Sequence, residues 1–112
     1  MDGTQLDQVA DEQLALAREH HSGRSAVTLY GGREHHLRQT LIALVGGRTL
    51  GEHESPGEAT LQVLRGRVRL HAGSEEWSGA AGGLVAIPPA RHDLEAIEDA
   101  VVLLTVTNRL AD

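Results

Sequence analysis

The sequence contains no cysteine, no phenylalanine and no lysine, and these absences limit what the protein can do. Without cysteine it cannot form a disulfide, use a thiolate as a nucleophile or bind a metal through sulfur. Because it has one tryptophan and one tyrosine, its core must be built from Leu, Val, Ile and Ala. A core so poor in aromatic rings favours burial of further apolar surface by self-association.

Acidic residues outnumber basic residues by 16 to 10, which gives a formal net charge of −6. The arginines are scattered and form no basic run, so nucleic acids and anionic membranes are poor candidates for partners. No apolar stretch approaches the ~18–20 residues that a membrane-spanning helix needs, and the N-terminus is acidic and polar. We therefore expect a cytoplasmic protein that binds neither nucleic acid nor membrane.

The chain has 112 residues, enough for one hydrophobic core, and we expect a single domain over residues 1–112. Residues 4–20 carry apolar side chains at the i, i+3, i+4 spacing of one helical face, which predicts an N-terminal helix. Thr4 is the expected N-cap, and Gly23 is expected to follow the helix in a left-handed conformation.

Beyond this helix the pattern changes to short apolar or alternating runs separated by glycine and proline. These runs predict strands over residues 25–30, 34–45, 48–54, 59–65, 67–72, 84–87, 92–97 and 100–107. Residues 73–83 are small and polar apart from Trp77, and they predict a loop or a short edge hairpin. The run 101–106 is apolar throughout, as in a strand covered on both faces. Strands at such short intervals are typical of an all-β sandwich or barrel.

Two stretches combine glycine, proline and histidine at spacings that indicate one site. In the first, five residues separate Gly47 from His53, and Gly66 closes the stretch after a Pro-Gly turn and an apolar strand. In the second, five residues separate Gly82 from Pro88, and His92 follows shortly afterwards. The two histidines are therefore the first candidates for binding residues.

In order and separation, these stretches resemble the two motifs of the small single-domain cupins, which are RmlC-like jelly-roll proteins. The resemblance covers about residues 38–107. It implies a mainly β fold, a cupin-type jelly-roll β-barrel over about residues 25–107 with one N-terminal α-helix over 4–20. By analogy with the family, it also implies a homodimer.

The metal-binding positions that the resemblance implies are only half filled. His53 and His92 keep a ligand, whereas Ser55 stands at the second histidine position. The glutamate position falls on Ala59, or on Thr60 at the longer spacing, and Glu58 lies one residue earlier. The motifs are thus degenerate, and the histidines are candidate metal ligands without a full set.

Side chains alternate along a strand, which gives a first assignment of the pocket. The face directed at the barrel interior would carry Thr49, Gly51, His53 and Ser55. Gln62 faces outward in regular alternation and inward if a bulge follows the Pro-Gly turn. The inward orientation of His92 depends on its shortened turn, and the polar residues 38–40 either line the cavity mouth or lie on the surface. The expected ligand pocket is His53, Ser55, Gln62, His92 and Gln39.

We therefore expect a protein that binds a small molecule in the barrel pocket around His53 and His92. The alternative is a metal-dependent cupin enzyme of the dioxygenase, isomerase or decarboxylase type. In that case the histidines would hold a divalent transition metal (Zn, Fe, Mn, Ni or Cu), and Glu58 would act as third ligand or general base. Gln62, His35 and His36 are the other candidates for a third ligand. A structural dimerisation module is a further alternative. The depleted ligand set favours the first.

Overall fold

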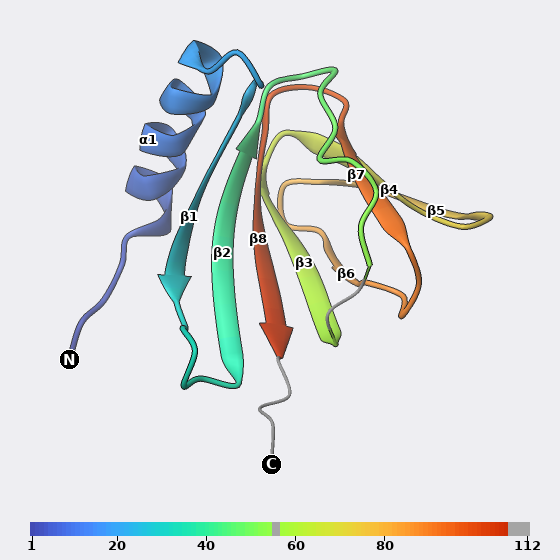
Figure 1. The fold of residues 1–112 in the computed structure, drawn as a ribbon. Helices are drawn as coiled ribbons and strands as arrows, with labels where there is room; N and C mark the ends of the chain where they lie inside the picture. The colour runs from blue at the N-terminus through green and yellow to red at the C-terminus, as the bar shows by residue number, and fades with distance from the viewer. Residues whose placement is uncertain (55–56, 108–112) are drawn as a thin grey trace.

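The computed structural model describes residues 1–54 and 57–107 and, within them, contains two antiparallel β-sheets and one helix (Figure 1). The larger sheet has the strand order β1-β2-β8-β3-β6, and the smaller sheet has the order β5-β4-β7. The strands are β1 (Arg24–Tyr30), β2 (Leu37–Leu44), β3 (Glu58–Arg65), β4 (Arg67–Ala72), β5 (Glu75–Ala80), β6 (Leu84–Ala86), β7 (His92–Ala96) and β8 (Ala100–Thr107). The helix is α1 (Leu6–Glu19). The predicted mainly β jelly-roll with an N-terminal helix is confirmed.

The barrel core lies between the two sheets and is aliphatic. In the larger sheet, the inner faces of β2 and β8 bury Leu44 and Val102. They face Val68 and Leu94 of the smaller sheet, which are buried as well. Trp77 packs against the same cluster. Among the described residues, no other Phe, Tyr or Trp side chain does so. Leu, Val, Ile and Ala therefore fill the barrel, as the composition requires.

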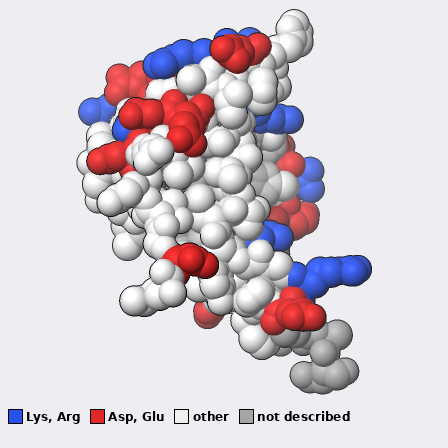
Figure 2. All heavy atoms as spheres, turned by 90° about the vertical axis from the view of Figure 1, so that its left-hand side faces the viewer, with Lys and Arg blue, Asp and Glu red and all other residues white. Residues whose placement is uncertain are grey.

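The outer face of the central strands is also apolar, and α1 covers it. Leu41 on β2 and Val101 on β8 are fully buried against Ala10 and Leu14 of the helix. β8 is consequently covered on both faces over most of its length, as predicted from its continuous apolar run. On the side of α1 and β1, several acidic groups lie in the upper left part of the surface, and the middle is largely uncharged (Figure 2).

The start of the helix differs from the prediction. Gln5, not Thr4, is the N-cap residue, and its side chain makes no capping hydrogen bond. Its extended backbone instead presents the carbonyl oxygen to the N–H of Val9 at 3.2 Å. Gly23 has the expected positive φ, +70°, and its carbonyl accepts the N–H of Val45 at 2.8 Å. In the described part of the chain, no helix is both long and apolar enough to cross a membrane.

Two predicted strands are also corrected, and one open alternative is decided. Residues 48–54 form no continuous strand, because Gly51 has φ +88° and interrupts the extended backbone. β2 begins at Leu37 instead of residue 34, after a turn. Residues 73–83 contain β5, which forms an edge hairpin with β4 and decides between the two alternatives left open for this segment.

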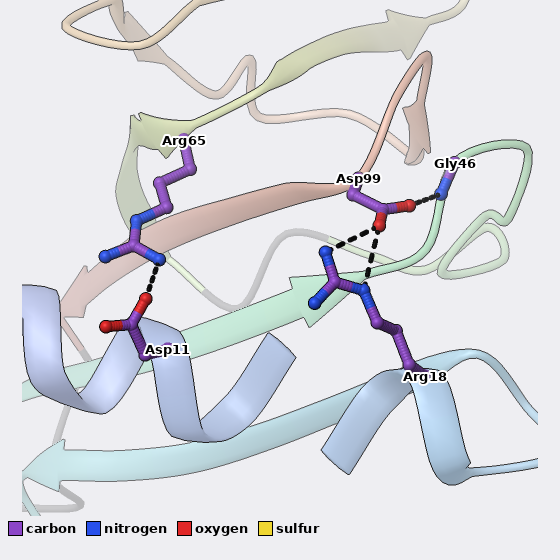
Figure 3. Close-up of polar contacts among 5 residues, drawn as sticks. All are labelled: Asp11, Arg18, Gly46, Arg65 and Asp99. Atoms are coloured by element: carbon purple, nitrogen blue, oxygen red, sulfur yellow. Dashed lines mark hydrogen bonds and ion pairs between the residues drawn. The ribbon is translucent and has the colours of Figure 1, made fainter. Parts of the chain in front are cut away.

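Two arginine contacts join α1 to the barrel (Figure 3). Arg65, at the end of β3, pairs with Asp11 of α1. Arg18 of α1 donates two hydrogen bonds, of 3.1 and 3.0 Å, to one carboxylate oxygen of Asp99. The other oxygen accepts the N–H of Gly46 at 2.9 Å. The Gly46 amide first, and then Arg18, lower the pKa of Asp99 below its ordinary value.

Candidate functional site

His53 and His92 form a pair on the inner face of the barrel wall. Their rings meet edge to face, with centroids 4.4 Å apart and planes at 68°. Two backbone hydrogen bonds of 3.0 Å join the residues directly across an antiparallel bridge, so their side chains share a face. His92 alternates with the core residues Leu94 and Ala96 and is only 4% exposed, whereas His53 is exposed. His92 therefore faces the interior, and His53 extends the pair to solvent.

One extra residue before His53 gives it this orientation. The segment from Thr49 to His53 spans four residue steps, while its partner segment from Glu95 to His92 spans three. Gly51 accommodates the difference in its left-handed conformation, as in a β-bulge. In an uninterrupted strand, a residue three positions from His53 would face the opposite side. Because of the extra residue, Leu50 packs on the inner core. The prediction that Thr49 and Gly51 share the face of His53 is wrong, because it assumed uninterrupted alternation.

A nearby backbone carbonyl fixes each imidazole through its Nδ1 atom. The Nδ1 of His53 lies 2.8 Å from the oxygen of Gly51, and that of His92 lies 3.0 Å from the oxygen of Ala90. A carbonyl only accepts, so each Nδ1 carries a proton and donates it. In the neutral ring Nε2 then has a free lone pair, and within residues 1–54 and 57–107 no group donates to either Nε2. Each histidine can therefore accept a hydrogen bond from a ligand or coordinate a cation.

The described residues do not complete a metal site around this pair. Zinc and iron sites in proteins use at least three protein ligands. No group of three or more His, Asp or Glu side chains in residues 1–54 and 57–107 is arranged to hold an ion. His35, one of the candidate third ligands, is exposed, and its ring packs against Tyr30 with centroids 5.0 Å apart. Two imidazoles without a third protein ligand fit a hydrogen-bonded ligand better than a resident metal.

The other predicted site residues that the structure describes lie apart from the pair. Gln39 is on the outer face of β2 and donates a hydrogen bond of 3.2 Å to the Thr105 hydroxyl. Gln62 is exposed on the outer face of β3, so the bulge that would turn it inward does not occur at its position. Glu58 is exposed at the start of β3 and follows the same outward alternation. Ser55 lies outside the described residues.

A large open cavity lies next to the pair. Its volume is about 910 Å³, and its walls include Glu54, Glu58, Ile87 and Ala90. Ala90 connects the two features, because its carbonyl holds the imidazole of His92. The histidines themselves do not line this cavity or a smaller one of about 250 Å³ beside Trp77. We take the converging imidazoles to mark the site, because an open hollow at a strand edge has no comparable chemistry.

The polar side chains that β2 directs inward are those of Arg38 and Thr40. They alternate with Gln39 and share a face with Ile42 and Leu44, which belong to the inner core. The sequence could not decide among residues 38–40, because β2 is apolar on both faces further along and shows no alternation. Only the packing of α1 on one of these faces fixes which residues point into the barrel.

The similarity of this chain to known proteins is one of structure. No protein-family model and no curated protein matches the sequence. Among solved structures, the chain is similar to a conserved protein of unknown function from Streptococcus pyogenes. The TM-score is 0.72 and the identity 28%, with 82% of this chain and 80% of that chain covered.

Two further similarities are to proteins described as a cupin and as a dioxygenase. A cupin superfamily protein from Desulfitobacterium hafniense aligns with a TM-score of 0.70 and 13% identity, covering 77% of this chain and 78% of that chain. A mutant salicylate 1,2-dioxygenase from Pseudoaminobacter salicylatoxidans aligns with a TM-score of 0.73 and 19% identity, covering 91% of this chain but 32% of that chain. With its two facing sheets and its pair of inner-wall histidines, the chain is thus a small domain of the cupin fold.

Proposed function

We propose that this domain binds a small polar molecule inside the barrel, with His53 and His92 as its hydrogen-bond acceptors. The observation that carries the proposal is the fixed orientation of both imidazoles. Their Nδ1 atoms are held at 2.8 and 3.0 Å from backbone carbonyls, so both Nε2 atoms are left for another partner. A ligand hydroxyl or amine could donate a hydrogen bond to either of these acceptors.

The surroundings of the pair support a small-molecule site. Ligand pockets are largely apolar and contain a few polar groups that fix the ligand orientation. The core residues Leu94, Leu61 and Val106 line the inner wall, and His92 is the one buried polar residue among those described. A single buried imidazole next to an accessible one offers this combination of apolar contact and oriented acceptors.

The test is a thermal-shift screen of small hydroxylated and amine-bearing compounds, followed by titration of each hit. Binding is expected to weaken by about ten-fold in both His53→Ala and His92→Ala, because each variant loses one hydrogen bond to the ligand. His71→Ala is the matched control, because His71 lies on the outer face of β4 beside Glu76. Hits that bind equally well to both pocket variants would contradict the proposed site.

A metal-dependent enzyme is the second candidate, and the same Nδ1 contacts favour it. Histidines that coordinate a metal usually donate their other ring nitrogen to a carbonyl or carboxylate. His53 and His92 would then hold a divalent metal through Nε2, and Glu58 would have to move to serve as third ligand or general base. Elemental analysis of the untagged protein, followed by titration with Zn, Fe, Mn, Ni and Cu, separates the candidates. Stoichiometric metal that is lost in both histidine variants would favour the enzyme.

A further inference from the structure

The inner face of β1 and β2 carries three polar side chains that no contact in the barrel explains. On β2 they are Arg38 and Thr40, which alternate with Ile42 of the inner core. On β1, Thr28 lies directly opposite Thr40, and its neighbour Leu29 packs toward the helix on the other face. The Cβ atoms of two directly opposed residues are about 5 Å apart, and Arg38 is the next residue on the same face of β2, so we treat the three side chains as one cluster.

This cluster lies at the same end of the barrel as the histidine pair. Gly66 alone joins β3 to β4, so both strands leave that turn together toward the far end. Along the larger sheet, Arg38 is in register with Val106, and Val106 is in register with Ala59 at the far end of β3. On the smaller sheet, His92 pairs with the last residue of β4. The two polar groups therefore occupy facing sheets at one level.

The cluster remains open because the smaller sheet does not extend over β1. Thr28 and Arg38 are exposed although they lie on the inward face, and Thr40 is half-buried. The Arg24 guanidinium donates a hydrogen bond of 3.5 Å to the Leu50 carbonyl and so connects the edges of the barrel near its other end. Thr28 and Arg38 of the cluster and His53 of the pair are thus all accessible from solvent.

Arg38 is one of five described arginines that pair with no acidic side chain; the others are Arg24, Arg33, Arg48 and Arg67. Arg65 pairs with Asp11, Arg69 with Glu95 and Arg91 with Glu54. Arg38 has no ion-pair or hydrogen-bond partner in residues 1–54 and 57–107. Its place on the inward face, at the level of the histidine pair, distinguishes Arg38 from the other four and fits an anionic ligand.

We propose that Arg38, with Thr28 and Thr40, binds the carboxylate of a small hydroxy acid whose hydroxyl group donates to one Nε2 atom of the His53–His92 pair. The inference rests on the proposed function and names its substrate class. A guanidinium binds a carboxylate through two parallel hydrogen bonds, and the threonine hydroxyls can donate to its remaining lone pairs. The hydroxyl group of the same molecule is a donor and can satisfy one of the two Nε2 acceptors. One arginine with two hydroxyls matches a single carboxylate charge better than a doubly charged phosphate.

The experiment compares hydroxy acids with their primary amides, which keep the shape and lose the charge. The probes are glycolate and mandelate, in which the hydroxyl lies on the carbon next to the carboxylate, and 4-hydroxybenzoate, in which the two groups lie further apart, together with the three amides and inorganic phosphate. Binding to the full chain is followed by isothermal titration and by the ¹⁵N resonances of the imidazoles. The variants are Arg38→Gln and the matched control Arg67→Gln, which removes an exposed arginine from the outer face of β4.

At least one hydroxy acid is expected to bind about ten-fold or more tightly than its amide. That preference should be lost in Arg38→Gln and kept in Arg67→Gln, with the Nε2 resonance of at least one histidine of the pair shifted on binding. Some ligands could depend on His53 but bind no more tightly as carboxylates than as amides, or could retain the carboxylate preference in Arg38→Gln. Either result would overturn the anion subsite and leave the proposed function intact. Tighter binding of phosphate than of every acid would overturn the choice of carboxylate. No imidazole shift with any probe would overturn the hydroxy-acid assignment, and hits from the wider screen would then decide the proposed function.

Discussion

Asp99 is the residue whose replacement tests most directly how the helix is attached to the barrel. Asp99→Ala leaves the Gly46 N–H without its acceptor, which costs about 1–2 kcal/mol. It also breaks the ion pair with Arg18, but the two side chains are 37% and 56% exposed, so that loss adds only about 0.5 kcal/mol. We expect the free energy of unfolding to fall by about 2 kcal/mol, or the Tm by roughly 8 °C.

Two further variants separate the amide contact from the ion pair. Asp99→Asn keeps an oxygen that can accept the Gly46 N–H and loses the charge, so it should cost about 1 kcal/mol. Arg18→Ala removes the ion pair alone and should cost about 0.5 kcal/mol. The expected order of destabilisation is therefore Asp99→Ala, Asp99→Asn and Arg18→Ala.

The same contact makes stability depend on pH in a defined direction. The folded state lowers the pKa of Asp99, so at acid pH the unfolded state binds its proton more readily. The stabilisation is thus fully present above the unfolded-state pKa of about 3.9, and it is lost as the pH falls through the folded-state pKa. The stability difference between the wild type and Asp99→Asn should shrink as the pH falls from about 5 to about 3.

Urea denaturation at a series of pH values measures all three variants, and the fluorescence of the single tryptophan reports unfolding. Trp77 packs against the inner core, so its emission should change when the barrel opens. Equal stability of Asp99→Ala and Arg18→Ala would refute the inference that the hydrogen bond from the Gly46 amide stabilises the fold more than the ion pair does. A difference from Asp99→Asn that stays constant down to pH 3 would refute the lowered pKa.

Two smaller predictions concern a turn and the second helix contact. Gly66→Ala should cost more than about 3 kcal/mol, because Gly66 has φ +76° and an added Cβ would lie 2.1 Å from the oxygen of Asp99. Gly73→Ala, with φ +62° and no atom within 4 Å, should cost only about 1–2 kcal/mol, and equal Tm values of the two variants would contradict the clash. Arg65→Ala should cost under about 1 kcal/mol, less at high salt, since its partner Asp11 is largely exposed. A loss of several kcal/mol in urea denaturation at high salt would show that the contact is more than a surface ion pair.

The fold could be predicted from the sequence because its signals are local. Glycine and proline mark most turns, and the two partial motifs occur in the right order with His53 and His92 in place. The inward orientation of His92 could not be predicted, because it depends on how a turn that is one residue short is accommodated. The backbone bridge to His53 settles it in the structure.

The wall of the candidate site is harder to predict than its histidines. The expected pocket contains Gln39, whereas Arg38 and Thr40 face inward in the structure. A strand that is apolar on both faces does not show which alternate residues point into the barrel. The inward residues are identified only by which face α1 covers, and this contact joins segments that are distant in sequence. The inward position of Leu50 could not be predicted either, because the left-handed Gly51 changes which alternate residues face inward.

The distribution of polarity along the barrel separates stability from binding. Near the Gly66 turn, β8 is covered by the smaller sheet on one face and by α1 on the other, and Val101 and Val102 are almost fully buried. Toward the far end the inner face gains polar groups, from Arg38 and Thr40 on one sheet to His92 on the other. Substitutions near the turn should therefore lower the free energy of unfolding, whereas polar substitutions at Arg38 or His53, both exposed, should leave it nearly unchanged. A variant that loses ligand binding at an unchanged Tm consequently reports on the site itself.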